Sequence, residues 1–365
     1  MNEILLSLVA VLSTSPVSAE PPSYGGELNI GTVVVTLSAL SWDPADWTWK
    51  SNHDVGNVRE QLFAGDLSKS IRKGGIYSFI PEAYLPADSI RGELAESWEW
   101  EDPLTLVIHL RKGIFFPAKP GVMRQRELVA DDVVYSYDLV NESEKRIPTY
   151  FDHIKNVVAR DQHTVVFNFS EYNAEWAYRF GYGYYSGISP REMANVDRKS
   201  WKNVTGTGPF ILERYVQANA QIYARNEKYW DSEKIDDKNY PIPFVDKITY
   251  RIIKDEATFL TALRTGQLDI LEAIRWIAVD HLKETTPELK WNKWLATSGT
   301  FVALREDMAP FDDVRVRRAL NLAVNQQEIV DRFYGGHAEL MAYPQHPGYG
   351  KYFESLGTMP DSIKQ

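Results

Sequence analysis

The sequence comprises 365 residues, of which 44% are hydrophobic and 25% are charged, so the chain is long enough for two domains with substantial cores. Forty Lys and Arg against fifty Asp and Glu residues give a net charge of -10, which disfavours nucleic acid as a partner because phosphate binding requires a basic surface. The absence of cysteine excludes disulfides, thiolate metal sites and a cysteine nucleophile.

Residues 1–19 have the pattern of a signal peptide. Ile4 to Leu12 is a short apolar run, and Val17-Ser18-Ala19 places small residues at the positions that a signal peptidase reads. The run is far shorter than the ~20 residues that span a bilayer, which disfavours a membrane anchor. No Lys or Arg precedes the run, which suggests a misplaced start codon or a missing upstream segment. We expect cleavage before Glu20 and a free periplasmic protein, since no cysteine is available for lipid attachment.

The mature chain opens with a predicted strand at Tyr24 to Gly31, where a Gly-Gly turn precedes a β-branched run. Tryptophans crowd the loop that follows: Trp42, Trp47 and Trp49. They could stack on a ligand, or they could pack the core of their own domain.

Residues 54–63 carry apolar side chains at helical spacing, which predicts a helix there. Residues 68–89 are rich in Gly, Pro and Ser, and we expect a long surface loop. Leu104 to Leu110 is a predicted strand because it alternates and follows an acidic turn. Asp131-Asp132 precedes apolar residues at three- and four-residue steps, which predicts a helix capped by a carboxylate.

Two strands, at 154–159 and 165–169, and an aromatic helix at 174–180 are expected next. Residues 181–190, GYGYYSGISP, are the most ligand-like stretch, since small residues let a partner approach the backbone. Three tyrosines there offer ring faces and hydroxyls: Tyr182, Tyr184 and Tyr185. The alternative is an interdomain loop that holds the domain together, and both interpretations remain open.

The turn at 206–209 is not a nucleotide loop, because it lacks a third glycine and Pro209 begins an alternating strand. A strand is predicted at 244–253, and a helix at 257–264 that ends at Gly266. Asp312 is expected to cap a further helix, whose inward-facing residues would be Val316, Ala319, Leu320 and Ala323. A last helix, at 325–334, would end at Gly335-Gly336.

Motifs in this order resemble the signature of the family 5 extracellular solute-binding proteins, which serve ABC importers of oligopeptides, dipeptides and related solutes. The motifs are LAESWE at 94–99, LRKGIFF at 110–116, ADDVVYSY at 130–137, GTGPF at 206–210, RNEKYW at 225–230, GQLDI at 266–270 and PFDDVRVRRAL at 310–320.

The resemblance implies an α/β fold, the two-lobed periplasmic binding protein of the type 2 kind. Lobe I would span 20–250 with an extra subdomain inserted at about 50–170, and the strand at 244–253 would cross to lobe II at 251–365. Family members continue well beyond the PFDDVRVRRAL helix, whereas only about thirty residues follow Gly335 here. We therefore expect an incomplete lobe II that exposes apolar surface and binds dye.

The resemblance also places residues in a ligand cleft. Ser38 and Leu40 would reach it from the loop before Asp43-Pro44, and Glu272 would line it after GQLDI, with Trp276 more loosely placed. A glutamate there could receive an ammonium or guanidinium, or it could be a solvated surface carboxylate. The full candidate set is Ser38, Leu40, Trp47, Tyr182, Tyr184, Tyr185, Glu272 and Trp276.

Enzyme interpretations find little support in the sequence. The pairs Asp131-Asp132 and Asp312-Asp313 suit helix caps better than a glycosidase, and no Gly-x-Ser-x-Gly is present. The seven histidines are dispersed, which disfavours a zinc enzyme, although His337 and His346 could bind nickel as in some relatives.

The sequence therefore predicts a periplasmic substrate-binding receptor of an ABC transporter, not an enzyme, which binds peptides or related amine-bearing solutes by hinge closure. Its partners would be a small-molecule or peptide ligand and the inner-membrane permease, and it would be a monomer without cofactor, metal or nucleic acid. The alternatives are a secreted carbohydrate-active enzyme and a chemosensory co-receptor of the same fold.

Overall fold

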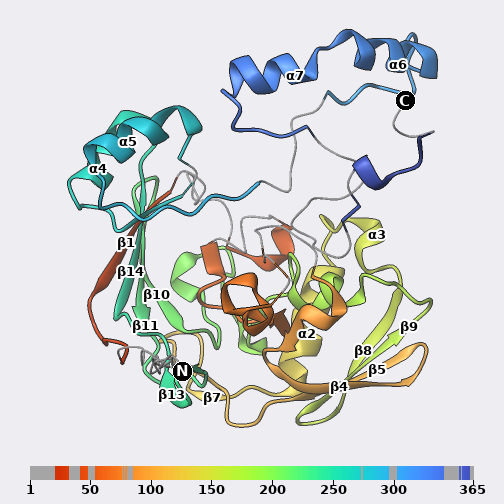
Figure 1. Cartoon of the computed structure of the whole chain (residues 1–365). Helices are drawn as coiled ribbons and strands as arrows, with labels where there is room; N and C mark the ends of the chain where they lie inside the picture. Colours follow the sequence, from red (N-terminus) through yellow and green to blue (C-terminus); the bar gives the residue numbers. More distant parts are fainter. Residues whose placement is uncertain are drawn as a thin grey trace, which may run out of the picture.

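The computed structural model describes residues 21–32, 42–47, 54–75, 77, 79, 85–272, 274–295, 302–340, 353–354 and 356–361. Two larger sheets dominate this part of the chain, one of five strands and one of four (Figure 1). The expected signal peptide, Trp49 and the candidates Ser38 and Leu40 lie outside the described residues.

The five-stranded sheet has the order β10-β11-β14-β1-β15. Its strands are β1 (Glu27–Thr32), β10 (Phe210–Val216), β11 (Ala220–Arg225), β14 (Lys247–Ile252) and β15 (Ile270–Leu271). The central strand β1 runs parallel to β14, from Glu27↔Lys247 to Thr32↔Ile252, and parallel to β15 at Ile30↔Ile270. The segments that follow these three parallel strands therefore emerge at the same end of the sheet, where the strands have their carboxyl ends, here called the carboxyl edge.

Helices α4 (Glu256–Arg264) and α5 (Val279–Thr285) lie at that end of the sheet (Figure 1). The predicted C-terminal stop of α4 is confirmed, because Gly266 has the left-handed φ of 68° that favours glycine. The predicted strands at 210–215 and 244–253 are confirmed as β10 and β14.

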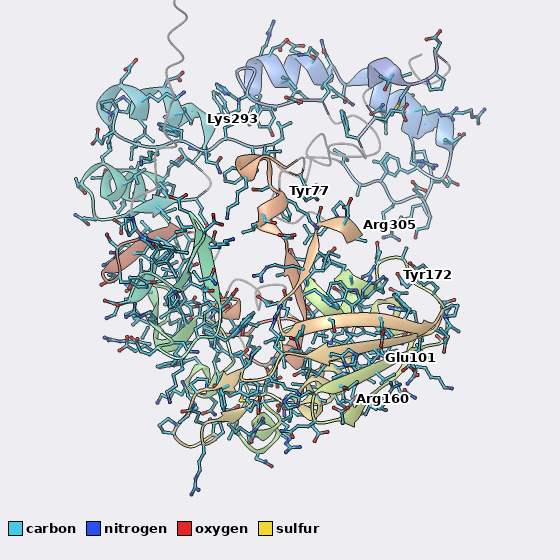
Figure 2. All side chains as sticks on the ribbon, turned by 60° about the horizontal axis from the view of Figure 1, so that its bottom comes forward. Tyr77, Glu101, Arg160, Tyr172, Lys293 and Arg305 are labelled. Atoms are coloured by element: carbon cyan, nitrogen blue, oxygen red, sulfur yellow. The ribbon has the colours of Figure 1, made fainter. Side chains whose placement is uncertain are left out.

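The four-stranded antiparallel sheet has the order β4-β5-β9-β8. Its strands are β4 (Ala95–Asp102), β5 (Thr105–Leu110), β8 (Ile154–Asp161) and β9 (Thr164–Phe169), as the sequence predicts for the last three. An ion pair joins its two edge strands, with Arg160 Nη2 2.9 Å from Glu101 Oε2, and both residues are labelled in Figure 2.

Helix α2 (Ala130–Asn141) packs on this sheet against β8 and β9 (Figure 1). Its inner face buries Val133, Tyr137 and Val140, and the Tyr137 ring lies 6.2 Å from that of Phe167. The predicted carboxylate at its N-terminus is Asp132, which is fully buried and accepts a hydrogen bond from Val129 N at 3.0 Å.

Three two-stranded sheets complete the strand inventory of the described residues: β2 (Phe63–Gly65) with β3 (Ile90–Gly92), β6 (Phe115–Phe116) with β7 (Arg126–Glu127), and β12 (Ser232–Ile235) with β13 (Lys238–Pro241). The remaining helices there are α3 (Pro148–Phe151), α6 (Val314–Ala323) and α7 (Gln326–Glu328), which continues into the π-helical turn η9 (Ile329–Phe333). The expected aromatic helix at 174–180 leads into another π-helical turn, η5 (Tyr178–Tyr182). No helix of the described residues is long and apolar enough to span a bilayer.

The predicted helix over 54–63 is wrong beyond its first turn. Main-chain oxygens that would bond within a helix instead accept from distant segments: Val58 O from Gly208 N at 2.9 Å and Glu60 O from Ile188 N at 2.9 Å. The chain from Val58 to Leu62 is thus an extended connection between the two sheets, and it ends in β2.

The expectations for α6 need two corrections. Asp313 caps the helix, with Oδ1 accepting from Arg315 N at 2.8 Å, whereas Asp312 was expected. No residue of α6 is buried, although its apolar residues were expected to face inward, and Leu322 is 85% exposed. The final helix is confirmed in α7 and η9, which end at Gly335-Gly336, both with positive φ.

Candidate functional site

The carboxyl edge of the parallel strands β1, β14 and β15 is where α/β sheets commonly bind ligands, because successive connecting segments meet there. Glu272 follows β15 directly and is exposed. Ser38 and Leu40 belong to the segment that follows β1, in the part of the chain that the structure does not describe.

Tyr250, near the end of β14, lies beside Glu272. Its hydroxyl accepts a hydrogen bond from Asn57 Nδ2 at 3.3 Å. Burial raises the pKa of Tyr250, the Asn57 hydrogen bond opposes this shift, and the charge of Glu272 adds to it. The charge of Glu272 therefore acts on the Tyr250 hydroxyl, although strand β1 lies between β14 and β15 in the sheet.

Glu272 makes no ion pair with the described part of the chain. Arg275, three residues further along the chain, pairs with Glu256 instead, which leaves the Glu272 carboxylate to solvent or a ligand. A carboxylate with a phenol and an amide nearby provides acceptors for a cationic group such as an ammonium.

Trp47 belongs to the interior of the domain built on the four-stranded sheet. It is 9% exposed, and its Nε1 donates to Val140 O at 2.8 Å. Its ring lies 4.4 Å from that of Tyr185 and 5.3 Å from that of Tyr150. For Trp47, the structure therefore matches the core-packing alternative that the sequence left open.

The three predicted tyrosines are held by their own domain. Tyr182 Oη accepts from Leu85 N at 2.9 Å, and the Tyr184 carbonyl accepts from Tyr150 Oη at 3.2 Å. Tyr185 has a φ of 72°, a conformation that costs energy in a residue with a Cβ and that often marks functional loops. The structure brings Tyr185 and Trp47 together in one aromatic cluster, whereas Glu272 lies beside a different sheet.

Trp276 lies in the 3-10 helix η8 (Trp276–Ala278) and is half-buried. Its ring stacks on that of His337, with centroids 5.8 Å apart and planes at 18°. A Cβ on Gly335 would lie 3.2 Å from Cζ3 of Trp276, so glycine allows the close approach. Trp276 thus connects η8 to the turn after η9, and within the described residues no cluster of His, Asp and Glu could hold a metal.

A small cavity lies beneath α2 and measures ≈ 20 Å³. Its walls include Val133, Tyr137, Phe167 and Tyr185. This volume suffices for about one water molecule and is far too small for a peptide. The cavity is therefore a packing feature of the core.

Two carboxyls that the sequence did not single out are Glu60, which is buried, and Glu93, which is half-buried. Glu60 is 3% exposed, and its Oε1 accepts from Tyr229 Oη and Trp230 Nε1, both at 2.9 Å. Burial raises the pKa of both carboxyls, and the charge of Glu60 adds to the shift of Glu93. Tyr229 and Trp230 close the RNEKYW motif, so this motif could have indicated a buried acceptor.

Comparison with known proteins adds the family. The model of bacterial extracellular solute-binding proteins, family 5 (middle), matches residues 89–361. Di/tripeptide-binding protein 1 of Pseudomonas aeruginosa is 30% identical over 382 residues, which cover 98% of this chain and 66% of that protein.

Solved structures give the same fold. DppA from Helicobacter pylori in complex with the peptide STSA has a TM-score of 0.71 at 24% identity, over 89% of this chain and 61% of that one. The oligopeptide-binding protein AppA from Bacillus subtilis, in complex with a nonapeptide, has a TM-score of 0.68 at 21% identity, over 90% and 59%. The fold is that of a type 2 periplasmic binding protein, as the sequence predicted.

The first three curated relatives are matched over only 60–66% of their own length. The matched region of the family model nevertheless covers most of this chain, from the residue before β3 to the C-terminal segment. The motifs, the sheet topology and the family match agree, and the chain belongs to the family 5 bacterial extracellular solute-binding proteins.

Proposed function

We propose that the chain acts as the substrate-binding receptor of an ABC importer and takes peptides or other amine-bearing solutes. Its family consists of solute-binding proteins, and one relative is named a di/tripeptide-binding protein. The observation that carries the ligand class is Glu272, an exposed carboxylate without a salt-bridge partner among the described residues, at the carboxyl edge of β15.

In this proposal the α-ammonium of a peptide binds Glu272, beside Tyr250 and Asn57. Charge-assisted hydrogen bonds to a carboxylate are about twice as strong as neutral ones, which suits recognition of an amine. Ser38 and Leu40 would contribute from the segment after β1, and Trp276 would line the same cleft. Tyr182, Tyr184 and Tyr185 would face this cleft from the other domain, which is built on the four-stranded sheet.

The mode of action follows the two-lobed fold. Lobe I, at 20–250, and lobe II, from 251 onward, would close on the ligand by a hinge near the end of β14, where the chain passes into α4. The closed form would be read by the permease. The receptor would work as a periplasmic monomer after removal of residues 1–19, without catalysis.

Titration calorimetry of the full chain with a panel of di- and tripeptides tests the proposal. Glu272→Gln is expected to weaken a peptide with a free amino terminus about 100-fold, since a lost ionic partner costs about 3 kcal/mol. The same variant should bind the N-acetylated peptide as the wild type does, and its unliganded Tm should hardly change because the side chain is exposed.

Glu288→Gln is the matched control, because Glu288 is exposed in the same lobe and makes no ion pair among the described residues. Unchanged affinity of Glu272→Gln for the free peptide would remove Glu272 from the site. Binding of glycans but of no peptide by the wild type would refute the ligand class, and turnover of a glycan would point to the enzyme alternative.

A further inference from the structure

Two nitrogens of the buried Arg59 guanidinium have no hydrogen-bond partner among the described residues. Arg59 is 4% exposed, and its Nε and Nη2 atoms are buried and unpaired in the part of the chain that the structure describes. Buried guanidinium groups are normally paired with a carboxylate or held by several acceptors, because an uncompensated charge is strongly unfavourable inside a protein. The described residues therefore leave part of the hydrogen-bonding capacity of Arg59 unused.

The backbone around Arg59 is fixed on both sides. Its neighbour Val58 accepts from Gly208 N and its neighbour Glu60 accepts from Ile188 N, each at 2.9 Å. Gly187 lies against the side chain, since a Cβ there would be 3.3 Å from Cβ of Arg59 and 3.7 Å from its Cδ. Because two main-chain segments pack around the Arg59 side chain, it cannot turn into solvent without breaking these contacts.

The charges around Arg59 do not balance. Arg198 Nε donates to Asp43 Oδ2 at 2.9 Å, and Asp43 Oδ1 also accepts from Ala45 N at 3.0 Å. The charge of Asp43 also acts on Arg59, so this one carboxylate acts on two guanidinium groups. Among these three described side chains, one positive charge is in excess.

Arg59 keeps its charge at neutral pH. Burial lowers its pKa to about 10, while Asp43 and Tyr135 oppose the shift. Tyr135 belongs to the same cluster, because the charges of Arg198, Asp43 and Arg59 all act on its hydroxyl. That hydroxyl is itself buried and lies close to Arg198, and a phenol that accepts from a guanidinium still has its own O-H proton to donate.

We propose that Arg59, Arg198 and the Tyr135 hydroxyl form a buried site for one small monovalent anion, which is chloride in physiological solution. The excess of one positive charge suits a monovalent ion, whereas a divalent anion would leave a net negative charge in a buried position. The free N-H groups of Arg59 and the O-H group of Tyr135 provide donors of the kind that an anion requires. The ion would tie the segment 58–60 to α2 and to the turns at Asp43 and Arg198.

This site is distinct from the proposed peptide site. Arg59 packs between Gly187 and the segment at 206–208, whereas Glu272 stands at the exposed edge of β15. Failure of peptide binding would therefore leave the anion proposal intact, and the reverse also holds.

Thermal unfolding of the full chain in sodium chloride, sodium bromide and sodium gluconate at equal ionic strength tests the proposal. Chloride and bromide should raise the Tm by about 2–5 °C relative to gluconate, with saturation at high concentration, because a ligand of the folded state alone stabilises it. Arg59→Gln should abolish this dependence. Arg160→Gln, which changes an arginine in an exposed ion pair, should retain it.

Broadening of the ³⁵Cl NMR line gives a second readout that does not depend on unfolding. The wild type should broaden the free chloride line saturably, and Tyr135→Phe should weaken the binding by about tenfold through loss of one hydrogen bond to a charged group. Tyr135→Phe decides the matter if Arg59→Gln does not fold. Equal Tm values in chloride and gluconate with no saturable broadening would overturn the proposal, as would a chloride response that both variants leave unchanged.

Discussion

Helices α2 and α6 have similar sequence patterns but lie in opposite environments. Both have an apolar stripe and acidic residues at the N-terminus, yet α2 buries six of its twelve residues and α6 buries none of its ten. Figure 1 shows α2 against the four-stranded sheet, and α6 with α7 apart from both large sheets. A helical period therefore predicts a helix, whereas burial depends on a sheet whose strands are far away in the sequence.

The carboxylates at the N-termini of the two helices should differ most in their contribution to the free energy of unfolding. Asp132 accepts from Arg126 Nη1 at 2.8 Å and Nη2 at 2.7 Å, and also from the main chain at Val129 and Arg191. Asp132→Asn should lower the free energy of unfolding by about 3 kcal/mol, because it removes the charge from a fully buried partner of Arg126. Urea denaturation measures the loss.

Asp313→Asn is the matched change at α6, and it should leave the unfolding midpoint unaltered. Asn caps helices as well as Asp does, and the pair of Asp313 with Arg315 is exposed and of little weight. If Asp132→Asn and Asp313→Asn lowered the free energy of unfolding equally, the two N-terminal carboxylates would contribute equally to stability in solution, contrary to the structure.

The apolar faces provide the next contrast. Val133→Ala should cost about 2 kcal/mol, because Val133 is 1% exposed and the site cannot collapse around a smaller side chain. Leu322→Ala should change the free energy of unfolding by about 0.5 kcal/mol or less, since Leu322 is 85% exposed.

Leu322→Ser has a readout of its own. The exposed apolar face of α6 should bind 8-anilinonaphthalene-1-sulfonate, and the polar side chain should reduce the dye fluorescence. A large stability loss from Leu322→Ala would mean that a partner, such as a second copy of the chain, covers this face in solution.

Buried carboxyls extend the comparison to pH, with the smallest expected effect. Glu60 and Glu93 have pKa values raised by burial above the ordinary 4.5, so the folded protein holds their protons more tightly than the unfolded chain does. Stability from these groups is complete at acid pH and declines as pH rises from about 4.5 through neutrality.

Glu93→Gln should flatten this decline, because glutamine has no proton to lose. Glu96→Gln is the control, since Glu96 is exposed three residues further along the chain and should keep the wild-type slope. Chemical denaturation at a series of pH values gives both slopes. A steeper rather than flatter profile for Glu93→Gln would contradict the raised pKa of Glu93.

Local patterns predicted much of the fold. The strands at 104–110, 154–159 and 165–169 were expected from alternation and turns, and each is observed within a few residues of its predicted bounds. The segment 54–63 was missed because its main chain bonds to Ile188, Gly208 and Phe210, more than a hundred residues away. No periodicity within a short window can report such partners.

The candidate site, like the fold, was predicted only in part. Glu272 was expected in the ligand cleft from its position after a family motif. The structure shows it exposed just after β15, and its role in binding stays a prediction. Asn57 and Arg59 were not expected, because the helix assigned to that segment concealed their roles. Trp47 looked like a ligand platform by composition, but only the fold shows that Tyr150 and Tyr185 surround it.

The parallel pairing of β1 with β14 constrains the order in which the chain can fold. Residues 27–32 are made first, yet their neighbour at 247–252 is more than two hundred residues away, so a ribosome adding about 5–20 residues per second needs tens of seconds to supply it. The four-stranded sheet, by contrast, consists of two hairpins, β4 with β5 and β8 with β9, which are joined through the pairing of β5 with β9. Contacts within each hairpin are close in sequence, and such local contacts form fastest. Strand β1 is therefore one of the last of the described strands to become paired.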